Sequence, residues 1–180
     1  MLPADEKELL ARFHAPATRD SAFTELIKTY QERLYACIFR MVTDEEASKD
    51  ILQNVCIKVW KSLGQFRAES RISTWMYRIA VNEALNWLEL EKKRALQPLP
   101  DNGDASAQPA NLTISPETIE RKLQEAIRLL PDKQRTVFLL RYYEEMPYEE
   151  MSRILQTSEG ALKASYHHAV KKIQTLLLGH

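Results

Sequence analysis

Apolar residues recur at intervals of three and four along two long blocks of this sequence. In the last segment the successive intervals are 4, 3, 4 and 4, for Leu162, Tyr166, Ala169, Ile173 and Leu177. Such spacing places all of these side chains on one face of an α-helix. Only four glycines occur in 180 residues, and alternating runs typical of β-strands are hard to find. We therefore predict an all-α fold.

The two helical blocks are separated by residues 95–115, which contain prolines and small polar residues without a helical period. A stretch of this length without secondary structure is unusual inside one compact domain. We therefore expect two helical bundle domains, residues 1–94 and 116–180, joined by a flexible linker. A linker of about 20 residues reaches at most ~65–70 Å when extended and spans ~25 Å as a random coil.

Local signals predict the helix boundaries in the first block. We expect a short helix near Asp5–Phe13, a second helix capped by Ser21, and a third that is capped by Asp44 and ended by Gly64. A long helix is then predicted from Ser73 or Thr74 to about Arg94.

In the second block, Pro116 and Pro147 open helices and Pro131 separates two of them. Ser158 caps the last helix, after a tight connection at 156–157. Two short helices joined by a few residues, the second with a polar outer face, form the helix-turn-helix pattern.

The charge balance bears on the partners of this chain. It has 25 basic and 25 acidic residues, and a neutral total argues against strong binding to duplex DNA by the chain alone. No apolar run approaches the ~18 residues of a membrane span. The N-terminus is acidic where a signal peptide is basic. We expect a cytoplasmic protein with no membrane insertion.

The two cysteines, Cys37 and Cys56, fit no metal-binding spacing. Each lies on or beside an apolar helical stripe, so we expect buried thiols in preference to a disulfide or a redox site. We expect neither a metal nor a cofactor.

The outer face of the last helix is a candidate DNA-binding surface, with no acidic residue after Glu159. The residues predicted to point outward are Lys163, Ala164, His167, His168, Lys171 and Lys172, with Ser165 at the margin. The second helix of a helix-turn-helix fits the major groove, and lysine and serine can pair with base edges. The alternative is an ordinary solvated face. The adjacent histidines point about 100° apart and cannot chelate one metal ion.

The segment from Lys58 to Arg94 carries eight basic and four acidic residues, interleaved with aromatic residues. Aromatic rings beside cations suit unstacked bases, at ~1–3 kcal/mol for each stacked base. For Trp60 and Trp75 a place in the core is the better supported alternative. Asn82 and Asn86 lie four residues apart, which suits either base recognition or simple exposure to solvent.

Three segments resemble bacterial sigma factors of the extracytoplasmic function (ECF) class. They are DEEASKDILQNVCIKVW from Asp44, FRAESRISTWMYRIAVNEALNWL from Phe66, and LPDKQRTVFLLRYYEEMPYEEMSRILQTSEGALKASYHHAVKKI from Leu130. The resemblance covers about residues 21–94 and 116–176, with the three motifs in the same order. It implies a dissociable, non-enzymatic subunit that binds core RNA polymerase, recognises promoter DNA and promotes its melting. It also implies an anti-sigma factor as a partner.

The resemblance also implies roles for particular residues. Polymerase binding falls to Asp50, Leu52, Gln53 and Asn54. The residues implied for recognition and melting of the proximal promoter element are Phe66, Arg67, Trp75, Tyr77, Arg78, Asn82 and Asn86. The distal element lies one and a half to two DNA turns away. The residues implied for its recognition are Ser158, Lys163, Ala164, Ser165, His167, His168, Lys171 and Lys172.

Some positions depart from the family pattern. Asn54 replaces a frequent acid, Ser165 a common arginine and Gln156 the usual turn glycine. Two other functions explain less of the sequence. An ordinary helix-turn-helix regulator would leave the first block without a role, and an enzyme built on Cys56 lacks partner groups at catalytic spacing.

Overall fold

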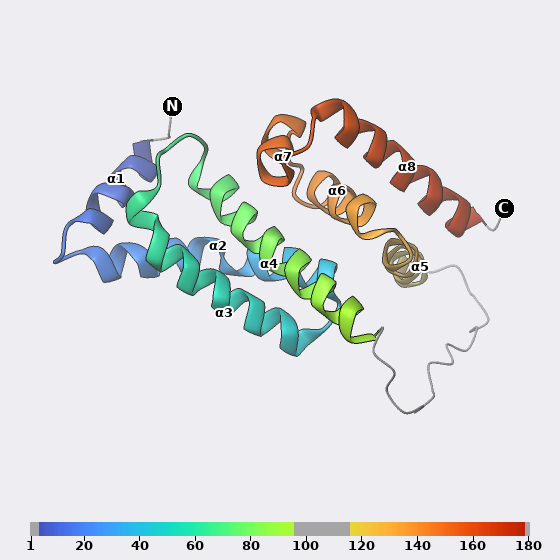
Figure 1. Ribbon diagram of the computed structural model, residues 1–180, viewed down its shortest axis with the longest axis horizontal. Helices are drawn as coiled ribbons and strands as arrows, with labels where there is room; N and C mark the ends of the chain where they lie inside the picture. Colours follow the sequence, from blue (N-terminus) through green and yellow to red (C-terminus); the bar gives the residue numbers. More distant parts are fainter. Residues whose placement is uncertain (1–3, 96–115, 179–180) are drawn as a thin grey trace.

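The computed structural model describes residues 4–95 and 116–178, which form helices and no strands, as predicted (Figure 1). The first half contains α1 (Ala4–His14), α2 (Arg19–Val42), α3 (Glu45–Ser62), the 3-10 turn η1 (Leu63–Gln65) and α4 (Ile72–Ala95). The second half contains α5 (Pro116–Arg128), α6 (Asp132–Tyr142), α7 (Tyr148–Leu155) and α8 (Glu159–Leu178). The predicted linker lies outside the described residues except for Ala95, the last residue of α4.

The first half is built on α2, which packs against α1, α3 and α4. Its apolar stripe is buried as the helical spacing predicts, with Leu26, Leu34, Ile38 and Met41 each at most 1% exposed. Cys37 lies in the same stripe and is buried, whereas Cys56 on α3 is half-buried, and both thiols are free. The expectation of buried thiols is therefore confirmed for Cys37 and only partly met for Cys56.

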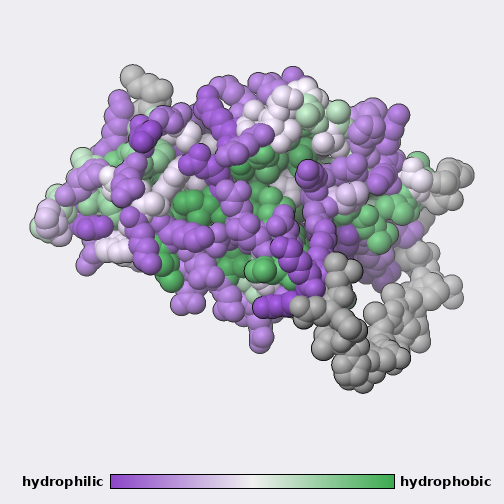
Figure 2. Space-filling model, in the orientation of Figure 1, coloured by the Kyte–Doolittle hydropathy of each residue, from purple (hydrophilic) through white to green (hydrophobic). Residues whose placement is uncertain are grey.

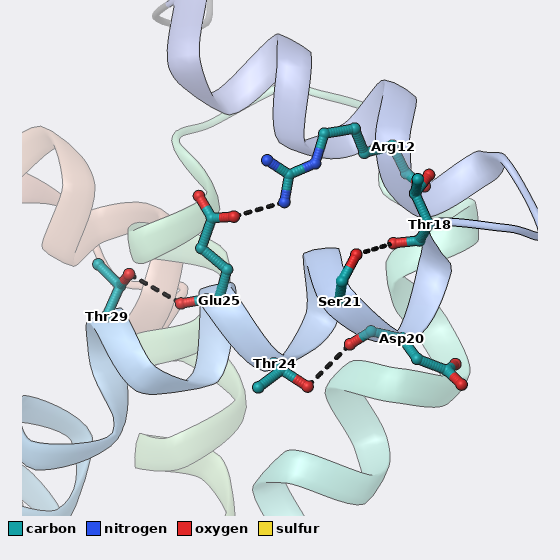
Figure 3. Close-up of polar contacts among 7 residues, drawn as sticks. All are labelled: Arg12, Thr18, Asp20, Ser21, Thr24, Glu25 and Thr29. Atoms are coloured by element: carbon teal, nitrogen blue, oxygen red, sulfur yellow. Dashed lines mark hydrogen bonds and ion pairs between the residues drawn. The ribbon is translucent and has the colours of Figure 1, made fainter.

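The junction of α1 and α2 corrects one predicted cap. Ser21 lies inside the first turn of α2, which begins at Arg19, and its hydroxyl donates to the carbonyl of Thr18 at 2.9 Å (Figure 3). Arg12 of α1 pairs with Glu25 of α2 across the same junction. The residue before α2 is Thr18, whose hydroxyl donates to the carbonyl of Arg12 at 2.7 Å, a contact that a search for single capping residues does not detect.

The boundaries of α3 and α4 follow local signals more closely. Asp44 caps α3, since its carboxylate accepts from the N–H of Ala47 at 2.8 Å. Helix α3 ends at Ser62, and Gly64 lies within η1. Helix α4 begins at Ile72, slightly before the predicted start, and a loop of six residues, 66–71, connects it to η1.

In the second half, α8 packs against α5, α6 and α7. The connection from α7 to α8 passes through Gln156, whose φ of 50° lies in the left-handed region. Ser158 caps α8 as predicted, because its hydroxyl oxygen accepts from the N–H of Ala161 at 3.3 Å. The pair α7–α8 thus has the helix-turn-helix arrangement.

The two halves pack against each other, with α4 against α7 and α2 against α6 (Figure 1). Buried apolar residues of both halves form one continuous cluster. Hydrophilic side chains cover much of the face seen in Figure 2, with apolar groups exposed between them. In the part of the chain that the structure describes, no helix has the length and hydropathy of a membrane span.

Candidate nucleic-acid interface

The outward face of α8 has the composition that its sequence predicts. Leu162, Ala169 and Ile173 are buried, and Tyr166 stacks on Phe138 of α6 with ring centroids 5.8 Å apart. These contacts turn the opposite face of the helix outward. The residues exposed on that side are Lys163, Ala164, His167, His168, Lys171 and Lys172, and Ser158 is exposed at the cap.

Two residues of this face have further contacts. Lys163 lies 3.5 Å from Glu159, one turn earlier, and its ammonium is 5.5 Å from the ring centroid of Tyr148 on α7. Ser165 is half-buried, and it lines a groove of about 260 Å³ together with Leu85 of α4. The margin of the α8 face therefore borders on the first half of the chain.

A second candidate site lies between η1 and the start of α4. Phe66, Arg67, Trp75 and Arg78, all predicted for the proximal element, line one cavity of about 300 Å³. The rings of Phe66 and Trp75 are tilted by 50°, with centroids 5.2 Å apart. Trp75 is 9% exposed, so it is part of the core and also part of the cavity wall. Aromatic rings and two cations therefore meet at one hollow.

Three further residues line this cavity and were not predicted from the sequence, namely Gln65, Glu69 and Ser70. They belong to the loop between the predicted helices, where periodicity carries no information. The loop is also strained, because Ala68 has a φ of 58°, a region that costs a residue with a Cβ atom ~1–2 kcal/mol.

Three predicted residues of the proximal site do not line the cavity. Asn82 and Asn86 are exposed farther along α4. Tyr77 is 4% exposed, and its hydroxyl donates to the carboxylate of Glu144, between α6 and α7. Burial, with the nearby Glu144 acting in the same direction, raises the pKa of the Tyr77 phenol. Tyr77 therefore faces the second half of the chain in this arrangement.

Trp60 follows its predicted alternative as a packing residue. Its ring meets those of Phe13 and Phe23 edge to face, at centroid distances of 5.6 Å and 4.9 Å. The guanidinium of Arg19 lies 4.7 Å from the centroid of Trp60 and 4.8 Å from that of Phe13. These contacts hold α1, α2 and α3 together.

A third surface lies on α3. Asp50, Gln53 and Asn54 are exposed, and Leu52 is half-buried. Ile57, one turn beyond Gln53 and Asn54, is 45% exposed and extends this surface with an apolar group. It was not predicted, because an apolar residue beside a buried stripe gives no signal by itself that it belongs to a binding surface.

The comparisons with known proteins identify the family. Residues 26–94 match the family described as Sigma-70 region 2, and residues 120–173 match Sigma-70, region 4. The RNA polymerase sigma-H factor of Pseudomonas aeruginosa is 31% identical over 87% of this chain and 86% of its own length. The ECF RNA polymerase sigma-E factor of Haemophilus influenzae is 30% identical over 85% and 86%. The chain belongs to the ECF sigma factors.

Solved structures support the fold of this ECF sigma factor. A co-crystal structure of the sigma factor RpoE with the anti-sigma factor NepR from Bartonella quintana superposes with a TM-score of 0.70 at 18% identity, over 86% of this chain and 96% of that one. A structure of CnrH with the cytosolic domain of CnrY gives 0.68 at 18% identity, over 97% of each chain.

Family membership establishes the general activity. As an ECF sigma factor, the chain binds core RNA polymerase and directs it to promoters for initiation. Sigma factors are initiation factors without enzymatic activity, so its chemistry is recognition.

Proposed function

We propose that the cavity between η1 and α4 captures an unstacked base of the proximal promoter element. The observation that carries this proposal is the convergence of Phe66, Trp75, Arg67 and Arg78 on one hollow of about 300 Å³. Extruding a base from the duplex costs a few kcal/mol in lost stacking and pairing. Stacking of the base on an aromatic ring contributes ~1–3 kcal/mol, and neighbouring cations bind the DNA backbone. Base capture therefore favours the melted state.

We propose that α8 reads the distal element. Its exposed lysines and histidines, with Ala164 and Ser165 as small residues, match a helix that enters the major groove. Lysine donates to guanine acceptors and to phosphates, whereas Ser165 can pair with either kind of edge. With a serine where an arginine is common, we expect few guanine contacts.

We propose that α3 docks on core polymerase through Asp50, Leu52, Gln53 and Asn54, with Ile57 beside them. An exposed apolar residue surrounded by polar groups is a common composition for a protein interface. In this assignment residues 1–94 form the polymerase-binding and melting domain, and residues 116–180 form the domain for the distal element. The residues between them act as the linker.

We further propose an anti-sigma factor as a partner and the cytoplasm, where the polymerase acts, as the location. The support for the partner is that the sigma factor RpoE, which has the same fold, has been captured in complex with the anti-sigma factor NepR, and CnrH, also of this fold, with a domain of CnrY.

The test uses the full chain with core polymerase in run-off transcription and permanganate footprinting. Promoter-specific transcripts and a reactive, melted segment are expected. Arg67→Ala should reduce the melted fraction by about tenfold, while Arg121→Ala, an exposed arginine of α5, should leave it unchanged. DNA binding without polymerase and without melting would instead indicate an ordinary helix-turn-helix regulator.

A further inference from the structure

The cavity between η1 and α4 brings charges of opposite sign together. Arg67 and Arg78 contribute guanidinium groups to it, and Glu69 is the one acidic residue in its lining. Every residue that lines the cavity belongs to the segment 65–78 of the first half. The walls of the cavity therefore come from this segment alone, whatever the position of the second half.

These three charged side chains are not paired with one another. Elsewhere on α4 an acidic residue is neutralised by a neighbouring helix, since Glu83 pairs with Lys58 of α3. Within residues 4–95 and 116–178, by contrast, no ion pair or side-chain hydrogen bond involves Glu69, Arg67 or Arg78. A carboxylate only accepts hydrogen bonds and a guanidinium only donates them, so the cavity offers both kinds of partner to a ligand.

The loop that carries Glu69 is tied to α4. The chain bends at Ala68, directly before Glu69, where φ is 58°. After Glu69, the carbonyl of Arg71 accepts from the hydroxyl of Ser70 at 3.3 Å and from the backbone N–H of Trp75 at 3.1 Å. Glu69 therefore lies on a bent loop that is anchored to the helix beside the cavity.

The four DNA bases differ in what they present to a carboxylate. Adenine, cytosine and guanine each carry an exocyclic amino group, which donates hydrogen bonds. Thymine carries none, and its carbonyl oxygens O2 and O4 flank its single N–H. A carboxylate that faces these oxygens loses its hydrogen bonds to water without gaining equivalent ones, which is unfavourable. An acidic residue in a base pocket therefore discriminates against thymine.

We propose that Glu69 gives the base pocket its specificity, by accepting a hydrogen bond from the amino group of the captured base and thereby excluding thymine. This inference rests on the proposed function and names the class of base that the same site takes. Phe66 and Trp75 do not supply this selectivity, because every base has a face that can stack on a ring. Arg67 and Arg78 donate to acceptor atoms of the base or to phosphate, which every nucleotide offers.

The alternative role for Glu69 is that of an ordinary solvated residue near DNA. In that role its negative charge only repels the phosphates, and its removal strengthens binding by the same factor for every sequence. As a base contact, its removal changes the ranking of the bases at one position. The two roles therefore differ in the sequence dependence of a variant, and not only in its overall affinity for DNA.

The test compares the wild type with Glu69→Gln, whose amide both donates and accepts and so has a partner on any base. The full chain with core polymerase transcribes variants of a promoter that it recognises, in which the proximal element is randomised and each variant is linked to a barcode in the transcript. The wild type should disfavour thymine about tenfold at one position of the element. Glu69→Gln should reduce that factor to about two or less, whereas Glu32→Gln, at an exposed position of α2, should keep the wild-type preference.

Base analogues isolate the contribution of the amino group. At the position so identified, pre-melted promoter DNA carries either the preferred base or the same base without its amino group, namely purine for adenine, hypoxanthine for guanine or 2-pyrimidinone for cytosine. Loss of the amino group should weaken binding of the wild-type holoenzyme about tenfold, and that of the Glu69→Gln holoenzyme about twofold or less. Because pre-melted DNA needs no strand separation, this experiment measures base capture alone.

The outcomes separate this inference from the proposed function. Equal use of thymine at every position by the wild type would overturn the role of Glu69, as would a Glu69→Gln protein with unchanged base preference or with a uniform gain on all promoters. Failure of base capture itself has a different signature. Phe66→Ala and Arg67→Ala would then melt the promoter as well as the wild type does, whatever the base preference.

Discussion

The carboxylate of Glu6, in α1, accepts a hydrogen bond from the backbone N–H of Ile72, the first residue of α4, with N and O 3.0 Å apart. The first N–H groups of a helix have no partner within it, and a negative charge is favoured there. Ile72 is 1% exposed, so its N–H has little access to water. Helix α1 precedes residues 26–94, which match Sigma-70 region 2, yet it supplies the hydrogen-bond acceptor at the end of the loop that we assign to base capture.

Replacing Glu6 with alanine should therefore impair melting more than polymerase binding. Loss of a helix cap costs ~1 kcal/mol, which corresponds to about a fivefold loss of the correctly positioned loop. Permanganate reactivity at the promoter measures the melted fraction, and a pull-down with core polymerase measures docking. Glu6→Gln keeps an acceptor oxygen and should restore most of the reactivity.

The control for this prediction is Glu8→Ala, on the same helix and exposed. Equal reactivity in Glu6→Ala and Glu8→Ala would show that the bond to Ile72 does not position the loop. Equal loss of melting and docking in Glu6→Ala would show that α1 acts only on the stability of the domain.

Features set by neighbouring residues were predictable from the sequence. Asp44 caps α3 because a short acceptor at that position reaches the N–H of Ala47. The outward face of α8 follows from the positions of Leu162 and Ile173, because the helical period leaves one side to the core and the other to water. Local rules were sufficient for both.

Features set by residues far apart in the chain were not predictable. The resemblance predicts a promoter contact for Tyr77, but nothing in the sequence indicates that its hydroxyl donates to Glu144, 67 positions later. The start of α2 was also misplaced, because the residue before it is Thr18, whose hydroxyl donates to the carbonyl of Arg12 in α1. Periodicity describes one helix at a time and does not indicate which carboxylate from another helix will reach it.

The turn between α7 and α8 gives a prediction about stability. Gln156 has a φ of 50°, which costs a residue with a Cβ atom ~1–2 kcal/mol, while glycine adopts it freely. Gln156→Gly should raise the free energy of unfolding by about 1 kcal/mol in urea titrations, after the entropy that glycine adds to the unfolded chain. Gln31→Gly, in the middle of α2, should lower it by about 1 kcal/mol. A loss of stability in Gln156→Gly would mean that the Gln156 side chain contributes more than the strain costs.

Cys37 gives a prediction about pH. Burial raises the pKa of its thiol to about 12, with Glu144 acting in the same direction. The folded state therefore favours the neutral thiol. The contribution of this thiol to the free energy of unfolding is complete below the unfolded pKa of ~8.5 and is lost as pH rises toward 12. Between pH 8 and pH 10 the free energy of unfolding should fall by about 2 kcal/mol more in the wild type than in Cys37→Ala.

Urea titrations at several pH values measure this difference, because the tyrosines titrate in both proteins and largely cancel. Cys37→Ala should be less stable at pH 8 because it leaves a small cavity, and the gap should narrow as pH rises. Parallel pH profiles for the two proteins would contradict the prediction.

Lys171 is exposed on α8, and replacing it tests whether it contacts phosphate or bases. As a phosphate contact it should release about one counterion, so Lys171→Ala should lower the salt slope of promoter binding by about one. At 0.15 M salt this corresponds to roughly a fivefold weaker complex, whatever the promoter sequence. Binding of the holoenzyme to several promoter variants across a salt series measures both quantities, with Lys28→Ala, an exposed lysine of α2, expected to match the wild type. A changed order of preference among the promoters would show instead that Lys171 reads base edges, because a phosphate contact cannot distinguish one sequence from another.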